Sequence, residues 1–121
     1  MSALTVYTYA NCDTCRRAVR WLRARGLAFV ERPIRETPPT VAELRTMLAA
    51  HAGEVRRLCN TAGRDYRELK LGEKLPAPGT AAVLGLLAKN GNLVKRPFVL
   101  GPGVALTGFD EKVWAATLTQ T

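Results

Sequence analysis

The sequence predicts an α/β fold, in which helices surround a small mixed sheet and a helical block separates its two halves. A β-rich run, an amphipathic helix and a second β-rich run occupy residues 3–33. A connecting helix of this length permits a parallel crossover. Two short β-rich runs, joined by a Gly-Pro-Gly turn that is typical of a hairpin, precede a final helix.

The first strand is predicted over residues 3–9, where alternating side chains share one face. Asn11 or Asp13 can cap the helix that follows, because short polar side chains satisfy free N–H groups at helix starts. Gly26 ends this helix, since glycine readily adopts the left-handed conformation that is favoured there. The second strand covers residues 27–32 and ends at the proline that follows.

The rest of the chain contains three helical segments, a hairpin and a last helix. Thr40 and Glu43 form a capping-box pattern at the start of the first of these helices. The predicted elements are a helix over 40–53, a short helix over 54–63, a helical turn leading into a loop over 64–78, an apolar helix over 79–91, strands over 98–100 and 104–107, and a helix from the capping Asp110 to Leu118.

Length and composition are those of one compact domain. The chain has 121 residues, of which 47% are hydrophobic, so it can bury a core without metals or disulfides. It shows neither a membrane span nor the basic start and apolar core of a secretory signal. A cytoplasmic protein is therefore expected. Three cysteines in that reducing setting indicate reactive or buried thiols rather than a disulfide framework.

The net charge of +8 does not identify a partner. Arginines concentrate between residues 16 and 35, and a solvated helix face is the favoured explanation. Attraction of anionic small molecules or of an acidic protein remain alternatives. Direct nucleic-acid binding is not expected, because the aromatic residues do not interleave with the arginines as a stacking platform requires.

Two cysteines three positions apart carry the strongest functional signal. Cys12 falls where the first strand gives way to a helix, and free N–H groups and the helix dipole favour a thiolate there. Cys15 lies one turn further on, in the apolar stripe, close enough to form a disulfide after modest adjustment. We therefore predict Cys12 as the nucleophile and Cys15 as the resolving thiol of a redox motif.

Other readings of the cysteines stay open. Two structural cysteines at a turn would give the same spacing. A zinc site needs four ligands, and only Cys59 and His51 remain as thiol or imidazole candidates, at no recognisable spacing. No metal is therefore expected, and Cys59 is interpreted as a small core residue in a helix.

The stretch "VKRPFVL" is the second informative one. Arg96 can present a guanidinium to an anion near the cysteines, with a bidentate geometry that suits oxyanions. Pro97 limits strand pairing and can adopt a cis bond in a tight turn. An edge proline beside a solvated arginine is an equally good interpretation of this stretch alone.

Three stretches, "VYTYANCDTCRRAVRWL", "VRRLCNTAGRDYREL" and "LVKRPFVLGPGVALTGFD", resemble in order and spacing the arsenate reductase (ArsC) family, which also contains the Spx regulators. The resemblance spans nearly the whole chain. It implies a thioredoxin-like (glutaredoxin-like) fold with a mixed four-stranded sheet. It also implies one domain over 1–121, with thioredoxin-like halves at about 1–36 and 92–121 and a helical insertion at about 38–91.

The resemblance also assigns roles. It implies that Cys12 is the nucleophile, that Arg96 binds the oxyanion and that Pro97 is a cis-proline facing the site. Asn11, Thr14 and Asn60 complete the predicted substrate-binding residues. No bound cofactor is expected. In arsenate reductases of this family glutathione with glutaredoxin completes the reduction, so glutathione or another thiol is the expected reductant.

Three departures from the arsenate reductases separate this chain from them. Asn60 stands where one further anion-binding arginine is expected, and "GPGVALTGF" has no arginine where the other falls. Arg56, Arg57 and Arg64 are the nearby candidates to replace them. Cys15 takes the place of a residue that is not a thiol.

These observations favour a thiol-disulfide oxidoreductase of the arsenate-reductase-like group, acting on a small thiol or oxyanion substrate. Glutaredoxin or thioredoxin are candidate protein partners, and arsenate reduction itself is a less favoured variant. The alternative is an Spx-like redox-sensing transcription regulator that binds RNA polymerase, with the disulfide as a switch. A family member whose cysteines are no longer used is a third hypothesis.

Overall fold

Four strands form one mixed sheet in the computed structural model, which describes residues 3–71 and 79–118. The order across the sheet is β2-β1-β3-β4. β1 pairs in parallel with β2, whereas β1 with β3 and β3 with β4 are antiparallel. The predicted mixed four-stranded sheet is confirmed. The strands are β1 (Leu4–Thr8), β2 (Phe29–Pro33), β3 (Phe98–Gly101) and β4 (Val104–Thr107).

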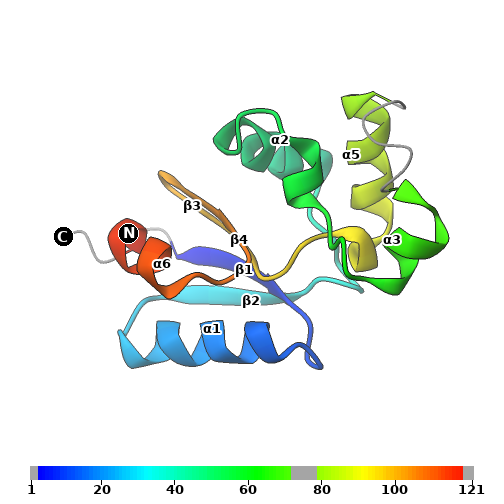
Figure 1. Cartoon of the computed structure of the whole chain (residues 1–121). Helices are drawn as coiled ribbons and strands as arrows, with labels where there is room; N and C mark the ends of the chain where they lie inside the picture. Colours follow the sequence, from blue (N-terminus) through cyan, green and yellow to red (C-terminus); the bar gives the residue numbers. More distant parts are fainter. Residues whose placement is uncertain (1–2, 72–78, 119–121) are drawn as a thin grey trace.

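Helices lie on both faces of this sheet (Figure 1). Helix α1 connects β1 to β2, and in the described residues three α-helices and two 3-10 turns follow before the chain returns to the sheet at β3. In Figure 1 the inserted helices α2, α3 and α5 lie on the side of the sheet away from α1, with α3 and α5 towards one end of it. The elements are α1 (Asp13–Ala24), α2 (Val41–Ala50), η1 (Val55–Leu58), α3 (Arg64–Glu68), α5 (Thr80–Lys89), η2 (Gly91–Leu93) and α6 (Glu111–Leu118).

Alternation along β1 divides the interior into two cores. Leu4 and Val6 face α1 and α6, where they join a cluster that includes the buried Trp114. Tyr7 points to the opposite face and meets Phe98 edge-on, with ring centroids 5.8 Å apart. This second cluster is completed by apolar residues of α2, η1 and α5. The inserted helices are therefore packed onto the sheet by a core of their own.

Two predicted boundaries need correction. The helix α1 is capped by Cys12 rather than by Asn11 or Asp13, since the Cys12 side chain accepts the free N–H of Cys15. The second strand begins at Phe29 and includes Pro33, which the sequence pattern placed after its end. β2 is an edge strand, and a proline is tolerated there because one side of the strand lacks a partner.

Other local predictions are confirmed. Gly26 follows α1 with a φ of 67°, the left-handed conformation that ends the helix. Thr40 and Glu43 form the predicted capping box. The prediction of a short helix over 54–63 that contains Cys59 is wrong. The helical turn is limited to η1, and Cys59 follows it in an extended conformation, where it forms an isolated bridge with Val94. Residues 72–78 of the predicted loop lie outside the described residues.

Candidate active site

The sulfur of Cys12 lies at the N-terminal entrance of α1. Its backbone is extended, with φ −103° and ψ 113°, and its Sγ accepts a hydrogen bond from the Cys15 N–H at 3.3 Å. The side chain is only partly buried. A thiolate at this position faces both a backbone donor and the positive end of the helix dipole. The fold therefore places Cys12 at the junction of strand and helix where the sequence pattern predicted it.

Cys15 differs from Cys12 in its surroundings. It is 1% exposed and belongs to the buried face of α1. Burial raises the pKa of the Cys15 thiol to about 12, and its hydrogen bond and charge interaction with Cys12 act in the same direction. Cys15 is therefore a protonated thiol at neutral pH. Both sulfurs are free in this structure.

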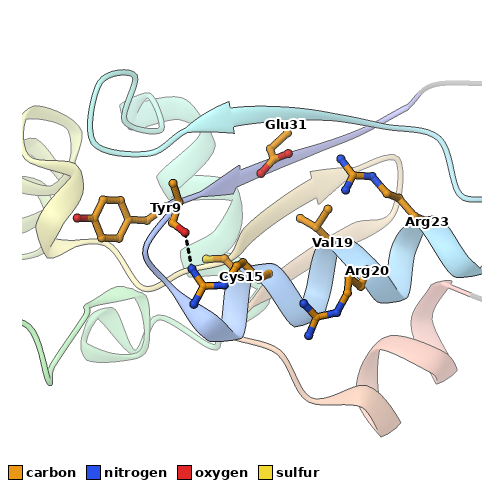
Figure 2. Close-up of a pocket in the computed structure, with 8 residues that line it drawn as sticks. Tyr9, Cys15, Val19, Arg20, Arg23 and Glu31 are labelled. Atoms are coloured by element: carbon orange, nitrogen blue, oxygen red, sulfur yellow. Dashed lines mark hydrogen bonds between the residues drawn. The ribbon is translucent and has the colours of Figure 1, made fainter.

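The two cysteines border different cavities. Cys15 lines a cavity of about 260 Å³ between α1 and β2, with Val19 on its wall (Figure 2). Cys12 instead borders a larger cleft of about 630 Å³, which we call the Cys12 cleft. The Cys12 cleft is therefore bordered by the first cysteine of the pair and not by the second.

Five predicted site residues come together in the Cys12 cleft, although they come from three separate stretches of the chain. Cys12 and its neighbours Asn11 and Thr14 form the side at the start of α1. Asn60 borders the cleft from the segment after η1, and Arg96 from the segment before β3. The cleft combines a sulfur, amide and hydroxyl groups and one guanidinium.

Arg96 is fixed by the backbone. Its Nη2 donates to the carbonyl of Gly91 at 2.8 Å and its Nε to that of Val94 at 3.3 Å. Partial burial lowers the pKa of Arg96, whereas the sulfur of Cys12 raises it. The guanidinium stays charged at neutral pH in either case. Arg96 therefore places a fixed positive charge within electrostatic range of the nucleophile.

The Arg96–Pro97 peptide bond is cis, as predicted. Pro97 is buried, and its carbonyl accepts the N–H of Gly108 at 2.9 Å. Its side chain is not among those that border the Cys12 cleft, whereas both Arg96 and Gly108 are. The proline thus lies beneath the wall of the cleft rather than on its surface.

Two residues that sequence reasoning did not select complete this region. The Tyr9 hydroxyl accepts hydrogen bonds from Arg35 at 3.0 Å and from Asn11 at 3.4 Å. These bonds, that of Asn11 first, lower the pKa of Tyr9. Both Arg35 and Arg96 lie over the Tyr9 ring, at 5.1 and 5.5 Å from its centroid.

A signal for both residues was present in the sequence. Tyr9 directly follows β1 and Arg35 closely follows β2, and carboxyl ends of parallel strands lie at the same edge of a sheet. The three arginines that the sequence nominated instead differ from Arg35. Arg57 pairs with Glu54, Arg64 pairs with acidic neighbours, and Arg56 does not border the cleft.

The described residues contain no group of three or more His, Cys, Asp or Glu side chains placed to hold a metal ion. Within the same residues, no helix combines the length and hydrophobicity that a membrane crossing requires.

The fold defines a thioredoxin-like protein. It has a mixed four-stranded sheet, a cysteine pair at the start of the first helix, and helices inserted before β3. The model of the ArsC family matches residues 7–117. The chain therefore belongs to the ArsC family, as its sequence motifs implied.

Relatives within this family carry different names. The uncharacterised protein YusI of Bacillus subtilis is 38% identical over 109 residues, covering 90% of this chain and 92% of YusI. The global transcriptional regulator Spx of Enterococcus faecalis is 28% identical (89% and 80% covered). An arsenate reductase of Rhizobium meliloti is 30% identical (82% and 69% covered). Among solved structures, an ArsC family related protein of Bacteroides fragilis superposes with a TM-score of 0.89 at 35% identity, covering 96% and 98% of the chains.

Proposed function

We propose that this protein is a thiol-disulfide oxidoreductase with Cys12 as nucleophile and Cys15 as resolving thiol. The observation that carries the proposal is the contact between the Cys15 N–H and the Cys12 sulfur at 3.3 Å, with the Cys15 side chain buried behind it. This arrangement presents one sulfur to a substrate and keeps the other in reserve. Asn11, Thr14, Asn60 and Arg96 border the same cleft and are the proposed substrate-binding residues.

The reaction proceeds by two exchanges. The Cys12 thiolate attacks one sulfur of a substrate disulfide, so that a mixed disulfide forms and the other sulfur leaves as a thiolate. The Cys15 sulfur then attacks the Cys12 sulfur and gives its proton to the second departing thiolate. The substrate gains two electrons and becomes two thiols, and the protein becomes the Cys12–Cys15 disulfide.

An external thiol closes the cycle. Two molecules of glutathione, or of another thiol, reduce the protein disulfide and leave as their own disulfide. Glutaredoxin or thioredoxin are candidate partners for this half of the cycle. We place this chemistry in the cytoplasm, where thiols are kept reduced.

The test is glutathione-dependent reduction of bis(2-hydroxyethyl) disulfide by wild type, Cys12→Ser and Cys15→Ser. Cys12→Ser is expected to abolish turnover and to remove the thiol that iodoacetamide alkylates at pH 7. Cys15→Ser is expected to accumulate a mixed disulfide at Cys12, visible as an added mass. A Cys12→Ser protein that reduces the disulfide as fast as wild type would refute the proposal.

Arsenate is a less favoured substrate of the same site. The resemblance implies three anion-binding arginines, and only Arg96 is present at the matching positions. A charged hydrogen bond contributes about 1.5–3 kcal/mol, so two missing guanidiniums weaken recognition of an oxyanion strongly. Arsenate turnover with glutathione and glutaredoxin is therefore expected to be slow beside disulfide turnover.

The second candidate function is that of an Spx-like regulator, in which the same disulfide is a switch. The similarity to Spx and the exposed arginines of α1, among them Arg16, Arg17 and Arg20, favour a protein-docking role. Co-purification of the oxidised protein with the α-subunit of RNA polymerase, together with no turnover of any disulfide, would establish this function instead.

A further inference from the structure

A smaller cavity of about 190 Å³ adjoins the Cys12 cleft, and we call it the basic cavity. Asn60 and Arg96 border both spaces, so the two are neighbours across these side chains. The basic cavity is completed on its other sides by Arg35, Arg64 and Asp65, with contributions from Gly63 and Asn92. Three guanidiniums and one carboxylate thus surround a space beside the cleft that Cys12 borders.

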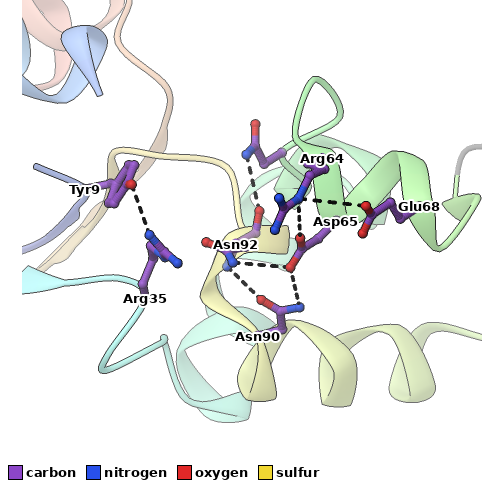
Figure 3. Close-up of polar contacts among 8 residues, drawn as sticks. Tyr9, Arg35, Arg64, Asp65, Glu68, Asn90 and Asn92 are labelled. Atoms are coloured by element: carbon purple, nitrogen blue, oxygen red, sulfur yellow. Dashed lines mark hydrogen bonds and ion pairs between the residues drawn. The ribbon is translucent and has the colours of Figure 1, made fainter. Parts of the chain in front are cut away.

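The carboxylate of Asp65 is already engaged (Figure 3). Its Oδ2 accepts hydrogen bonds from the side-chain amides of Asn90 at 3.0 Å and Asn92 at 3.2 Å. These two bonds lower the pKa of Asp65. The Arg64 Nε lies 3.9 Å from Asp65 Oδ1 and 3.9 Å from Glu68 Oε1. The charge of Arg64 is therefore balanced by its own acidic neighbours.

Arg35 is in a different position. Among the described residues it forms no ion pair with a carboxylate, and it donates from Nη1 to the neutral hydroxyl of Tyr9 at 3.0 Å. The positive charge of Arg35 lowers the pKa values of both Asp65 and Arg96, so Arg35 lies within electrostatic range of each. A guanidinium has five N–H donors, and most of those of Arg35 remain available to a ligand.

We infer that the basic cavity binds a carboxylate group of the substrate, with Arg35 as the residue that selects for it. The inference rests on the proposed function, because the substrate's sulfur must reach Cys12 in the adjoining cleft. The preferred substrate class is then a thiol or disulfide that carries a carboxylate. Arg35 and Arg96 together supply the positive charge. The amide of Asn60, which donates to the Asn92 carbonyl at 3.2 Å, borders both spaces.

The kinetic test compares two disulfides of similar length, 3,3′-dithiodipropionate, which carries two carboxylates, and neutral bis(2-hydroxyethyl) disulfide. The readout is the kcat/KM of the dicarboxylate divided by the kcat/KM of the neutral disulfide. We expect Arg35→Ala to lower this ratio by on the order of tenfold, as the loss of a charged hydrogen bond does. Arg35→Lys is expected to restore part of it, because the charge returns without the planar fork.

Arg45→Ala is the matched control. Arg45 is exposed on α2 and borders neither cavity, so its removal changes net charge equally without touching the site. The ratio is expected to be unchanged in this variant. A ratio that falls equally in Arg35→Ala and Arg45→Ala, or in neither, would refute the carboxylate site while leaving the oxidoreductase proposal intact.

A binding measurement separates the two proposals if no disulfide is turned over. Suberate replaces the S–S bond of dithiodipropionate by two methylenes, and 1,8-octanediol is its neutral counterpart. We expect suberate to bind wild type more tightly than the diol, and Arg35→Ala to remove most of that preference. Equal Kd values for the two compounds in wild type would overturn the inference.

Discussion

At the scale of single residues, Gly91 determines where the guanidinium of Arg96 lies. Its carbonyl accepts the Arg96 Nη2 hydrogen bond, and its Cα lies against the backbone of Ile34, so that a Cβ would overlap the Ile34 carbonyl. Gly91→Ala is therefore expected to force a backbone shift and to lower the free energy of unfolding by about 1–3 kcal/mol. Urea denaturation measures the loss, and disulfide turnover measures the displacement of Arg96.

Gly85 provides the control, because it lies inside α5 and a Cβ there would have no neighbour within 4 Å. Alanine at this position removes backbone freedom from the unfolded chain, so Gly85→Ala is expected to stabilise the protein by about 0.5–1 kcal/mol. Opposite signs for the two substitutions are the expected result. A Gly91→Ala protein as stable as wild type would mean that η2 and the segment after β2 do not pack as described.

At the scale of elements, helix α2 anchors the insertion through its first turn. The Thr40 Oγ1 accepts the N–H of Glu43 at 3.1 Å, and Glu43 Oε1 accepts the Thr40 N–H at 2.9 Å and the Tyr7 hydroxyl at 2.8 Å. Thr40→Ala is expected to cost about 1 kcal/mol of unfolding free energy, as loss of an N-cap does. Thr40→Ser should cost much less, and urea denaturation of the pair is the measurement. Equal losses in both variants would show that the hydroxyl is not the stabilising group.

Elements governed by neighbouring residues were predictable, and those governed by distant ones were less so. The capping box of α2, the turn at Gly26 and the hairpin of β3 and β4 follow from local chemistry, and all are present. The cap of α1 was assigned to the wrong residues because a thiol is a weak acceptor, and only the fold shows that Cys12 Sγ faces the free N–H. Arg35 was missed because its meeting with Arg96 depends on β1, β2 and β3 packing together.

At the scale of the whole molecule, the site is a product of assembly. Tyr9 follows β1, Arg35 follows β2, Asn60 follows η1 and Arg96 precedes β3, so both halves of the sheet and the insertion contribute to it. The two cores fix these parts relative to one another, one between sheet and α1 and one between sheet and insertion. Stability and site geometry therefore depend on the same packing. The titratable groups buried in that packing should affect how the free energy of unfolding depends on pH.

The last prediction concerns this pH dependence above neutrality. Burial raises the pKa of Cys15 to about 12, of Cys59 to about 11 and of Tyr7 to about 12. The unfolded chain releases these protons at ordinary values near 9 for cysteine and 10 for tyrosine, so the native state holds more protons between those values and 11–12. The free energy of unfolding therefore keeps its full value below about pH 9. Above that pH it falls by up to about 1.4 kcal/mol per pH unit for each group.

Cys59→Ala isolates one of these contributions. The variant loses the packing of the Cys59 side chain at every pH, and it has no thiol proton at this position to release. The free energy of unfolding should therefore fall less steeply between pH 9 and 11 in the variant than in wild type. Urea denaturation in the presence of reductant at pH 7, 9 and 10.5 gives both slopes. Parallel slopes for the two proteins would show that the Cys59 thiol, which contacts the Val55 carbonyl at 3.5 Å, ionises as readily in the folded protein as in the unfolded chain.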